Sequence, residues 1–316
     1  MSEGRDYIGY SDRVPTITWP DNNRLAVSLV LNYEEGSERS IEAGDAADES
    51  VGELGSFAMQ APNGRNPTIA SFFEYGSRVG AWRLLRILRR QDVKATVFAC
   101  AVAVDRHAEM ARAFVAAGHE ICNHGYRWED HFSFSAEEEA ERIRRAQDLL
   151  ERSTGIRPVG MFVNKGTTEH TRQILVEQGF LYDSNSYAED APYYVEIGDR
   201  KHLVLPYSCD TNDVRFWTTP GFMTGEAYCN YLCETLDVLL EEASTSGSVR
   251  MMSVGLHMRI TGRPARARAI EQFIIHAKAQ QGVWFARRDE IARWWLAHVP
   301  PVTRKDNEHR SPEPHA

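Results

Sequence analysis

Short apolar segments alternate along this chain with segments of helical periodicity, in units of about 25 to 40 residues. Such alternation is typical of a parallel sheet covered by its crossover helices. The expected strands are 24–32, 95–99, 119–123, 159–163, 203–207, 251–257 and 283–286. The expected helices are 82–88, 106–117, 135–154, 168–178, 224–243, 264–279 and 288–297. This order predicts an α/β fold.

Length and segment composition favour one closed domain. The chain has 316 residues, which allows one large domain or two ordinary ones. No linker composition separates two halves, so we expect a single domain over residues 1–302. A stretch rich in Gly, Ala and acidic residues without periodicity predicts a long surface excursion at about 41–66. The charged segment 303–316 is expected to be a disordered tail.

Composition and charge exclude several classes of function. Lys plus Arg number 36 and Asp plus Glu number 45, so the net charge is −9. An acidic surface repels phosphate backbones and anionic lipid, so we expect neither nucleic acid nor membrane as a partner. The chain has no stretch approaching the roughly 18 consecutive apolar residues of a membrane span and no apolar signal core, which predicts a cytoplasmic protein. The five cysteines are sparse and odd in number, and we expect reduced thiols.

Two adjacent carboxylates follow the first expected strand, 24–32. In α/β folds reactive groups collect where strands end. A turn at Gly36 could bring Glu34 and Glu35 toward one cavity, where such a pair can hold a metal or share a proton. Both are candidate catalytic residues, although a solvated acidic turn would have the same local sequence.

A histidine with polar and aromatic neighbours follows the expected strand 119–123. Segment 124–131 reads His-Gly-Tyr-Arg-Trp-Glu-Asp-His. His124 is a candidate catalytic residue. A metal site needs imidazoles and a carboxylate, and the candidate ligands are Glu35, His124 and His131. The spacing of the two histidines does not by itself indicate a metal, so a site without one stays open.

A third group of reactive side chains ends the strand 251–257. Segment 257–264 reads His-Met-Arg-Ile-Thr-Gly-Arg-Pro. His257 could give a proton to a leaving nitrogen, and Arg259 or Arg263 could hold a carbonyl or carboxylate group. The alternative is that both arginines lie on the surface and pair with the excess of acid.

These motifs belong to a longer series of segments in one order along the chain. The series consists of 13–20, 31–36, 74–80, 118–120, 124–128, 206–207, 212–215 and 257–264. In this order they resemble the polysaccharide deacetylase (NodB-homology) superfamily, and within it the allantoinase-like branch of cyclic amide hydrolases. The resemblance runs from about Arg13 to Trp295 and implies a deformed (β/α) barrel.

The same resemblance leaves a metal cofactor open. Its deacetylases end the first strand in Thr-Phe-Asp-Asp, a base and then a metal ligand, where this chain has Asn-Tyr-Glu-Glu at 32–35. They also have two histidines four apart, whereas His124 is followed at that distance by Trp128. One ligand is therefore missing unless His131 or Asp130 replaces it. Some allantoinase-like members are regarded as working without metal, so the resemblance implies either no cofactor or one divalent metal, zinc if one is present.

The function that the resemblance implies is hydrolysis of a C–N bond in a small cyclic amide, with allantoin as the first candidate. Glu34 or Glu35 would activate water, and His257 would protonate the departing nitrogen. The residues expected to bind substrate are Arg78, Arg127, Trp128, Asn212, Asp213 and Arg259. The branch pattern has Gly-Arg-Asp-Ser where this chain has Asn-Lys-Gly-Thr-Thr at 164–168, and Asp where it has Asn185. Hydantoins and cyclic imides therefore stay open as substrates.

Two other functions fit parts of the pattern. A metal-dependent N-deacetylase of an amino sugar or small acetamide would need a bound divalent ion. A barrel that has lost catalysis and binds a ligand would explain the missing second histidine. For the enzyme we expect a small-molecule substrate and assembly into a homo-oligomer.

Overall fold

The structure is a computed structural model that describes residues 5–11, 13–50 and 63–301, so the expected tail 303–316 lies outside it. Within these residues the strands form one nine-stranded sheet. The strands are β1 (Leu25–Tyr33), β2 (Thr96–Ala99), β3 (Glu120–Asn123), β4 (Gly160–Met161), β5 (Tyr182–Asp183), β6 (Tyr193–Ile197), β7 (Arg200–Val204), β8 (Arg250–His257) and β9 (Val283–Phe285).

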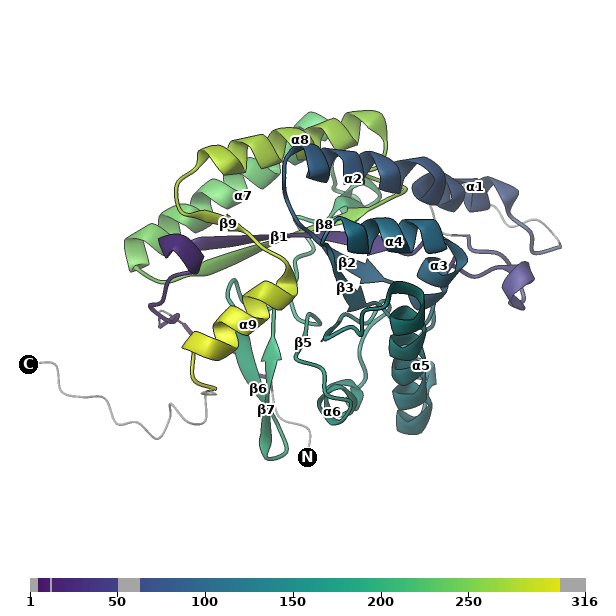
Figure 1. The fold of residues 1–316 in the computed structure, drawn as a ribbon, viewed down its shortest axis with the longest axis horizontal. Coiled ribbons are helices and arrows are strands. Elements are labelled where there is room, and N and C mark those ends of the chain that lie inside the picture. The colour runs from purple at the N-terminus through teal and green to yellow at the C-terminus, as the bar shows by residue number, and fades with distance from the viewer. Residues whose placement is uncertain (1–4, 12, 51–62, 302–316) are drawn as a thin grey trace, which may run out of the picture.

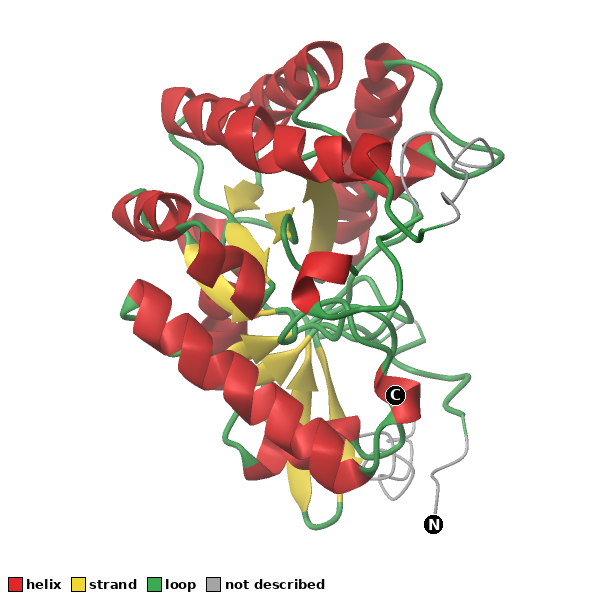
Figure 2. Cartoon of the chain, turned by 90° about the vertical axis from the view of Figure 1, so that its right-hand side faces the viewer, coloured by secondary structure: helices red, strands yellow, loops and turns green. Residues whose placement is uncertain are grey.

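The sheet has the order β6-β7-β5-β4-β3-β2-β1-β8, with β9 on β1. Every pairing is parallel except β6 with β7. Strand β8 pairs along one edge of β1, while β9 and β2 share the other edge, β9 at Leu25–Val27 and β2 at Val30–Tyr33. The sheet curls between the outer helices (Figures 1 and 2). The predicted deformed (β/α) barrel of the NodB type is confirmed.

Helices cover the outside of the curled sheet (Figure 2). They are α1 (Pro67–Tyr75), α2 (Ala81–Arg90), α3 (Ala101–Arg106), α4 (Ala108–Ala116), α5 (Ala136–Thr154), α6 (Thr171–Glu177), α7 (Gly225–Ser246), α8 (Pro264–Ala279) and α9 (Arg288–His298). Shorter turns are η1 (Pro20–Asn22), η2 (Ile41–Ala43), η4 (Gly76–Gly80), η5 (His131–Ser133) and η6 (Asp213–Phe216). Of these, η4 is a single π-helical segment that continues α1 into α2.

Most expected elements occur, with differences that have local causes. The helix expected at 106–117 corresponds to α4, and a further helix, α3, precedes it because His107, with φ −127° and ψ 67°, interrupts the helical backbone between the two. The helix expected at 135–154 is α5, and a capping box begins it: Ser135 accepts from the Glu138 N–H, and the Glu138 side chain accepts from the Ser135 N–H. Helices α1 and α3 and strands β5 and β6 were not predicted.

The long excursion expected at 41–66 is described in part, since 51–62 lie outside the described residues. Its two described ends meet at Asp48. The Asp48 N–H donates to Gly64 O at 2.8 Å, and the carboxylate accepts from the N–H groups of Ile41 and Asn66 at 2.9 and 2.7 Å. Asn66 then caps α1, with Pro67 at its first position. In the described part of the chain, no helix is both long and apolar enough to span a bilayer.

Strand β1 is buried on both faces and sets the direction of the residues that follow it. Leu25, Val27, Leu29, Leu31 and Tyr33 belong to the cluster that packs against the helices, whereas Ala26 and Val30 belong to the cluster inside the barrel. Side chains of a strand alternate between its faces. Glu34, the first residue after the strand, continues the inward-facing set, and Glu35 begins the turn that follows.

Candidate active site

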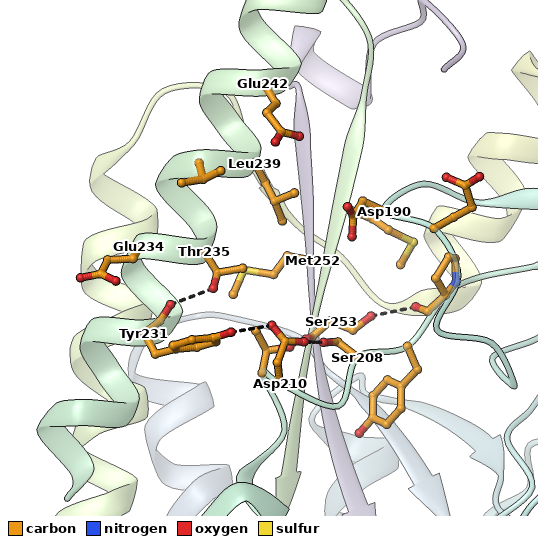
Figure 3. A pocket seen from close by; sticks show the side chains of 16 residues that line it. Asp190, Ser208, Asp210, Tyr231, Glu234, Thr235, Leu239, Glu242, Met252 and Ser253 are labelled. Atoms are coloured by element: carbon orange, nitrogen blue, oxygen red, sulfur yellow. Dashed lines mark hydrogen bonds between the residues drawn. The ribbon is translucent and has the colours of Figure 1, made fainter. Parts of the chain in front are cut away.

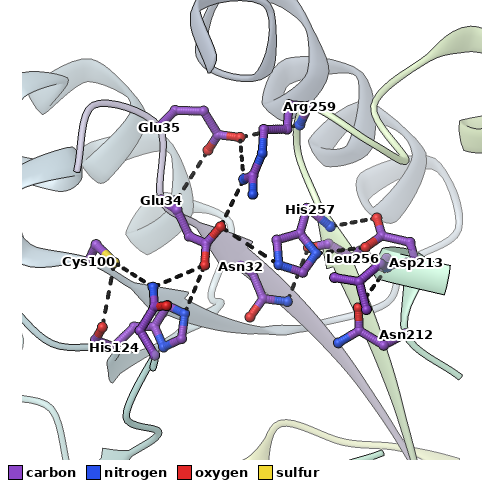
Figure 4. Close-up of polar contacts among 12 residues, drawn as sticks. Asn32, Glu34, Glu35, Cys100, His124, Asn212, Asp213, Leu256, His257 and Arg259 are labelled. Atoms are coloured by element: carbon purple, nitrogen blue, oxygen red, sulfur yellow. Dashed lines mark hydrogen bonds and ion pairs between the residues drawn. The ribbon is translucent and has the colours of Figure 1, made fainter. Parts of the chain in front are cut away.

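Glu34 is the centre of a buried polar network at the carboxyl end of β1 (Figure 4). Its Oε2 accepts from the Arg259 guanidinium at 2.8 Å and lies 3.7 Å from His257 Nε2. Its Oε1 lies 3.2 Å from His124 Nε2 and accepts from Asn164 Nδ2 at 3.2 Å. The ends of β1, β3, β4 and β8 thus converge on one carboxylate.

The charge of Glu34 is fixed by its partners. Burial alone would raise the pKa of this carboxyl, but the charges of Arg259 and His257 and the hydrogen bond from His124 hold its pKa well below the usual range. Glu34 is therefore ionised throughout the physiological range.

Arg259 is a fixed cation held by stacking as well as by ion pairs. It is 2% exposed, and its guanidinium lies 4.7 Å from the ring centroid of Phe73 and 5.2 Å from those of Trp128 and Trp217. Aromatic faces attract a guanidinium and limit its rotation. Arg259 is thereby directed toward Glu34.

His257 forms a dyad with Asp213. Its Nδ1–H donates to Asp213 Oδ1 at 2.7 Å, and its backbone N–H donates to Oδ2 at 2.7 Å. Thr261 also donates to Oδ2 from its hydroxyl, at 2.6 Å. Burial lowers the pKa of His257, but the carboxylates of Asp213 and Glu34 outweigh burial and raise it above its ordinary value. The imidazolium form is favoured, with Nε2–H facing Glu34.

His124 is held between two oxygen acceptors. Its Nδ1–H donates to Phe162 O at 2.8 Å, and its Nε2 faces Glu34 Oε1. Both ring nitrogens thus face oxygen atoms. Phe162 also stacks on His124 with ring centroids 5.4 Å apart. The ring orientation is thus fixed on two sides.

Glu35 lies under the turn η4 and also approaches the Arg259 guanidinium, whose Nη1 is 3.7 Å from its Oε1 (Figure 4). Its Oε2 accepts from the Glu34 N–H and its Oε1 from the Arg259 N–H, each at 3.2 Å. Burial, together with the neighbouring charge of Glu34, raises the pKa of Glu35 to about 7 against the opposing charge of Arg259. A turn does follow β1 at Glu35 and Gly36, and both carboxyls lie near one guanidinium nitrogen, Arg259 Nη1, at 2.8 Å from Glu34 and 3.7 Å from Glu35.

Comparison with known proteins identifies the family. The polysaccharide deacetylase family model matches residues 61–182. A Schizosaccharomyces pombe protein assigned to the polysaccharide deacetylases is 33% identical over 320 residues, covering 95% of this chain and 99% of its own length. The chain belongs to the polysaccharide deacetylase family.

Two crystal structures share nearly the whole fold of this deacetylase-family hydrolase. A Pseudomonas aeruginosa PAO1 protein assigned as a polysaccharide deacetylase is 44% identical, with a TM-score of 0.88 and coverage of 95% of this chain and all of that one. The PuuE allantoinase is 43% identical, with a TM-score of 0.88 and coverage of 96% and 100%. The chain is thus similar to proteins named for two different reactions.

The side chains around Glu34 do not fit the metal site of a deacetylase. In the described ranges no three His, Cys, Asp or Glu side chains are grouped to hold an ion. Glu35 lies under the turn η4, and its oxygens accept backbone N–H groups. His131 does not complete the set, because its Nδ1 is 3.1 Å from Glu139 Oε1 and the pair is buried. A divalent ion beside Glu34 would also meet the fixed charge of Arg259.

The structure separates the other expected substrate-binding residues. Arg78 is exposed and pairs with Glu74 at 3.2 Å, so it lies outside the site. Arg127 pairs with Asp45 and donates to Glu38 O at 2.9 Å. Arg127 therefore binds the loop that follows β1 and has no contact with Glu34.

Trp128 and Asn212 lie closer to the site. Trp128 packs beside Arg259, and the ammonium of Lys165 lies 4.8 Å from its ring centroid. Asn212 donates to Tyr207 OH at 3.2 Å, and its side-chain oxygen accepts from Val214 N–H at the start of η6, the turn that carries Asp213. Asn212 therefore acts through the backbone that presents the dyad.

Asn164 and Thr261 were not predicted as site residues. The signal for Asn164 was the departure from the branch pattern at 164–168, which indicated a changed site without giving a role. Thr261 lies four residues beyond His257, where the turn after β8 folds back so that both reach Asp213.

A separate cavity of about 420 Å³ lies between α7 and the first half of β8 (Figure 3). Asp190, Asp210 and Glu242 are among its lining residues, and Tyr231 OH donates to Asp210 at 3.0 Å. None of the residues that contact Glu34 lines it. The cavity is distinct from the candidate active site.

Proposed function

We propose that this protein hydrolyses the C–N bond of a small cyclic amide, with allantoin as the first candidate substrate. The observation that carries the proposal is the placement of an ionised carboxylate, Glu34, 3.7 Å from the imidazole of His257. Both are buried, and each is held by partners of its own. An acid and a base fixed at this separation suit addition of water and departure of an amide nitrogen.

Glu34 is the base in this reaction. Its carboxylate removes a proton from water as the water oxygen adds to the ring carbonyl carbon. The negative charge that develops on the carbonyl oxygen needs donors nearby, and the N–H groups of His124, Asn164 and Arg259 surround the same carboxylate. In the structure these N–H groups donate to Glu34, and they turn to the carbonyl oxygen as the carboxylate takes up the proton of water.

His257 is the acid. Its Nε2–H gives a proton to the ring nitrogen as the C–N bond breaks, and Asp213 stabilises the imidazolium until then. Glu34 then carries a proton and His257 lacks one. Transfer between them restores the starting state, and the new carboxylic acid loses its proton to solvent.

The choice of a ring substrate is supported by two observations. The PuuE allantoinase is similar over nearly the whole chain. In addition, the guanidinium of Arg259 beside Glu34 leaves the described donor set unsuited to the metal on which the N-deacetylase alternative depends.

The test is turnover of allantoin, hydantoin and succinimide by the purified protein, with and without added Zn²⁺. We expect Glu34→Gln and His257→Gln each to lower kcat/KM by roughly 10²- to 10⁴-fold, because each removes a proton-transfer group. Glu74→Gln and His276→Gln are matched controls at residues outside the network, and both should keep normal rates.

Other outcomes would overturn the proposal. Release of acetate from N-acetylglucosamine oligomers without opening of any ring would show a deacetylase. Saturable binding of a cyclic amide without turnover would show a barrel that only binds. Near-normal ring opening by Glu34→Gln would remove the assigned base.

A further inference from the structure

The carboxyl of Glu35 is covered by the backbone of the π-helical turn η4. Gly76, at the start of the turn, lies so close that an added Cβ would overlap the Glu35 carboxyl. At the other end, an added Cβ at Gly80 would overlap Met258 O. Both glycines are buried. The turn is therefore inserted between Glu35 and the segment after β8.

Side chains fasten the turn on both sides. On one side Ser77 Oγ lies 3.1 Å from Tyr33 OH and 2.9 Å from His107 Nδ1. On the other, Tyr75 OH donates to Gly262 O at 3.4 Å, and Arg83 donates to the same carbonyl. A π-helical segment within a longer helix is rare and frequently lies at a functional site.

Ser77, Tyr33 and His107 form a closed triangle of polar atoms. Tyr33 OH is 3.0 Å from His107 Nδ1, which completes the three contacts. Tyr33 is fully buried and adjoins Glu34, whereas His107 lies where α3 meets α4. The triangle therefore ties the turn to β1 and to a second pair of helices. None of these atoms contacts the network around Glu34.

The Glu35 carboxyl, which lies under the turn, holds the backbone of two site residues. Its two oxygens accept the backbone N–H groups of Glu34 and Arg259, the two residues whose side chains pair in the site. The charged groups facing Glu35 are Glu34 and Arg259, with the Tyr33 hydroxyl on the neighbouring position of β1. If water entered beneath the turn, it would compete for those hydrogen bonds.

We propose that Ser77 and His107 are positioning residues, which hold the turn Gly76–Gly80 against Glu35 and keep water from its carboxyl. Through Glu35 they maintain the spacing of Glu34 and Arg259. The kinetic part of this inference rests on the proposed ring hydrolysis, whereas the effect on Glu35 does not.

The experiment follows titration of the Glu35 carboxyl by ¹³C NMR in protein with ¹³C-labelled glutamate, assigned with Glu35→Gln. Ser77→Ala and His107→Leu should let water reach the carboxyl and move its titration midpoint down by about one pH unit. Ser77→Thr retains the hydroxyl and should restore the wild-type midpoint. Ser71→Ala, on the exposed side of α1, is the matched control.

A second readout is the pH dependence of kcat/KM for the ring substrate. Glu35 accepts the backbone N–H groups of Glu34 and Arg259, so titration of Glu35 should alter the rate, and this limb of the profile should move by the same amount. An unchanged midpoint in folded Ser77→Ala and His107→Leu would overturn the inference. If His107→Leu does not fold, the Glu35 midpoints of Ser77→Ala and Ser77→Thr are compared, and equal midpoints in these two variants overturn the inference. Should no ring be opened, the proposed function fails, but the NMR titration still tests the role of the turn.

Discussion

Two arginines, Arg259 and Arg288, are buried in the same barrel and have opposite surroundings. Arg259 faces the carboxylate of Glu34. Arg288, at the start of α9, faces neutral oxygens: it donates to Ser184 Oγ at 2.9 Å, to Ser253 Oγ and Pro206 O at 2.8 Å, and to Leu205 O.

The difference shows how one fold can use the same side chain for chemistry and for structure. Burial lowers the pKa of Arg288, and neutral acceptors rather than a carboxylate satisfy its donors. Arg259 instead shares charge with Glu34, which in turn faces His257. A network whose acceptors are fixed and neutral stabilises the fold, whereas one built from titratable groups can move protons.

The largest effects should come from replacing each arginine with Met. Arg259→Met leaves a buried carboxylate without its cation, so we expect a loss of about 3–5 kcal/mol of stability and at least 10²-fold in kcat/KM. Arg288→Met leaves several buried acceptors unsatisfied and should lose about 3 kcal/mol or more, with kcat nearly unchanged per folded molecule. Urea unfolding measures the stability of the two variants. Their kcat and kcat/KM are measured at a temperature where both variants are folded.

The control for this comparison is Arg293→Met, on the solvent side of α9, which should change neither quantity. An equal loss of kcat per folded molecule in Arg288→Met and Arg259→Met would contradict the assignment of Arg288 to the fold and Arg259 to the chemistry.

An intermediate effect is expected from the two carboxyls in these regions whose pKa burial raises to about 7, Glu35 and Glu120. A carboxyl that binds its proton more tightly in the folded state stabilises fully below its ordinary pKa of 4.5, and this contribution is lost as pH rises through about 7. Each carboxyl can contribute at most about 3 kcal/mol to the free energy of unfolding in this way. Stability should therefore fall between pH 5 and pH 8, and less steeply in Glu35→Gln and Glu120→Gln.

Urea unfolding at the two pH values checks this. The substitutions separate the regions further, because Glu35→Gln should also alter the pH profile of turnover and Glu120→Gln should not. Equal pH dependence of stability in wild type and both variants would contradict the assigned pKa shifts.

The smallest effect concerns Asn164. Asn164→Ala removes one of the donors to Glu34 Oε1 but leaves His124 and Arg259 in place. The loss of one hydrogen bond to a charged group that keeps others should lower kcat/KM by about 5- to 20-fold. Asn185→Ala, which removes hydrogen bonds to the backbone of Val163 instead, is the comparison variant. An equal loss in both would show that Asn164 acts only on loop structure.

Periodicity predicted most of the fold because its strands and helices have strong patterns. Strand β1 is buried on both faces and reads as an apolar run, and α5 has both a capping box and a terminal Gly155. The two-residue strand β5 is too short to show a period, whereas β4 lies within the longer apolar segment expected at 159–163. Helix α1 was missed because its start, Asn66 followed by Pro67, closes a stretch that otherwise lacks periodicity.

The positions of site residues were harder to predict, because they depend on partners distant in sequence. His131 was expected near Glu35, but Glu139, on the following helix, pairs with it. Arg78 pairs with Glu74 one turn earlier in its own helical segment. Conversely, the contact between Asn164 and Glu34 spans 130 residues and has no local signal.

The sharing of one edge of β1 by β2 and β9 bears on how the protein is made. Glu34 leaves the ribosome early, yet its partner Arg259 lies 225 residues later, and β9 completes the edge of β1 only at Phe285. Contacts between residues so far apart in sequence form slowly. During synthesis β1 therefore stays without its β9 partner until the last part of the barrel is made. Until then the apolar segment Leu25–Val27 is unpaired at the edge that β9 will occupy. Shortening the chain before Val283 would endanger the active site although no residue of that site lies beyond Thr261.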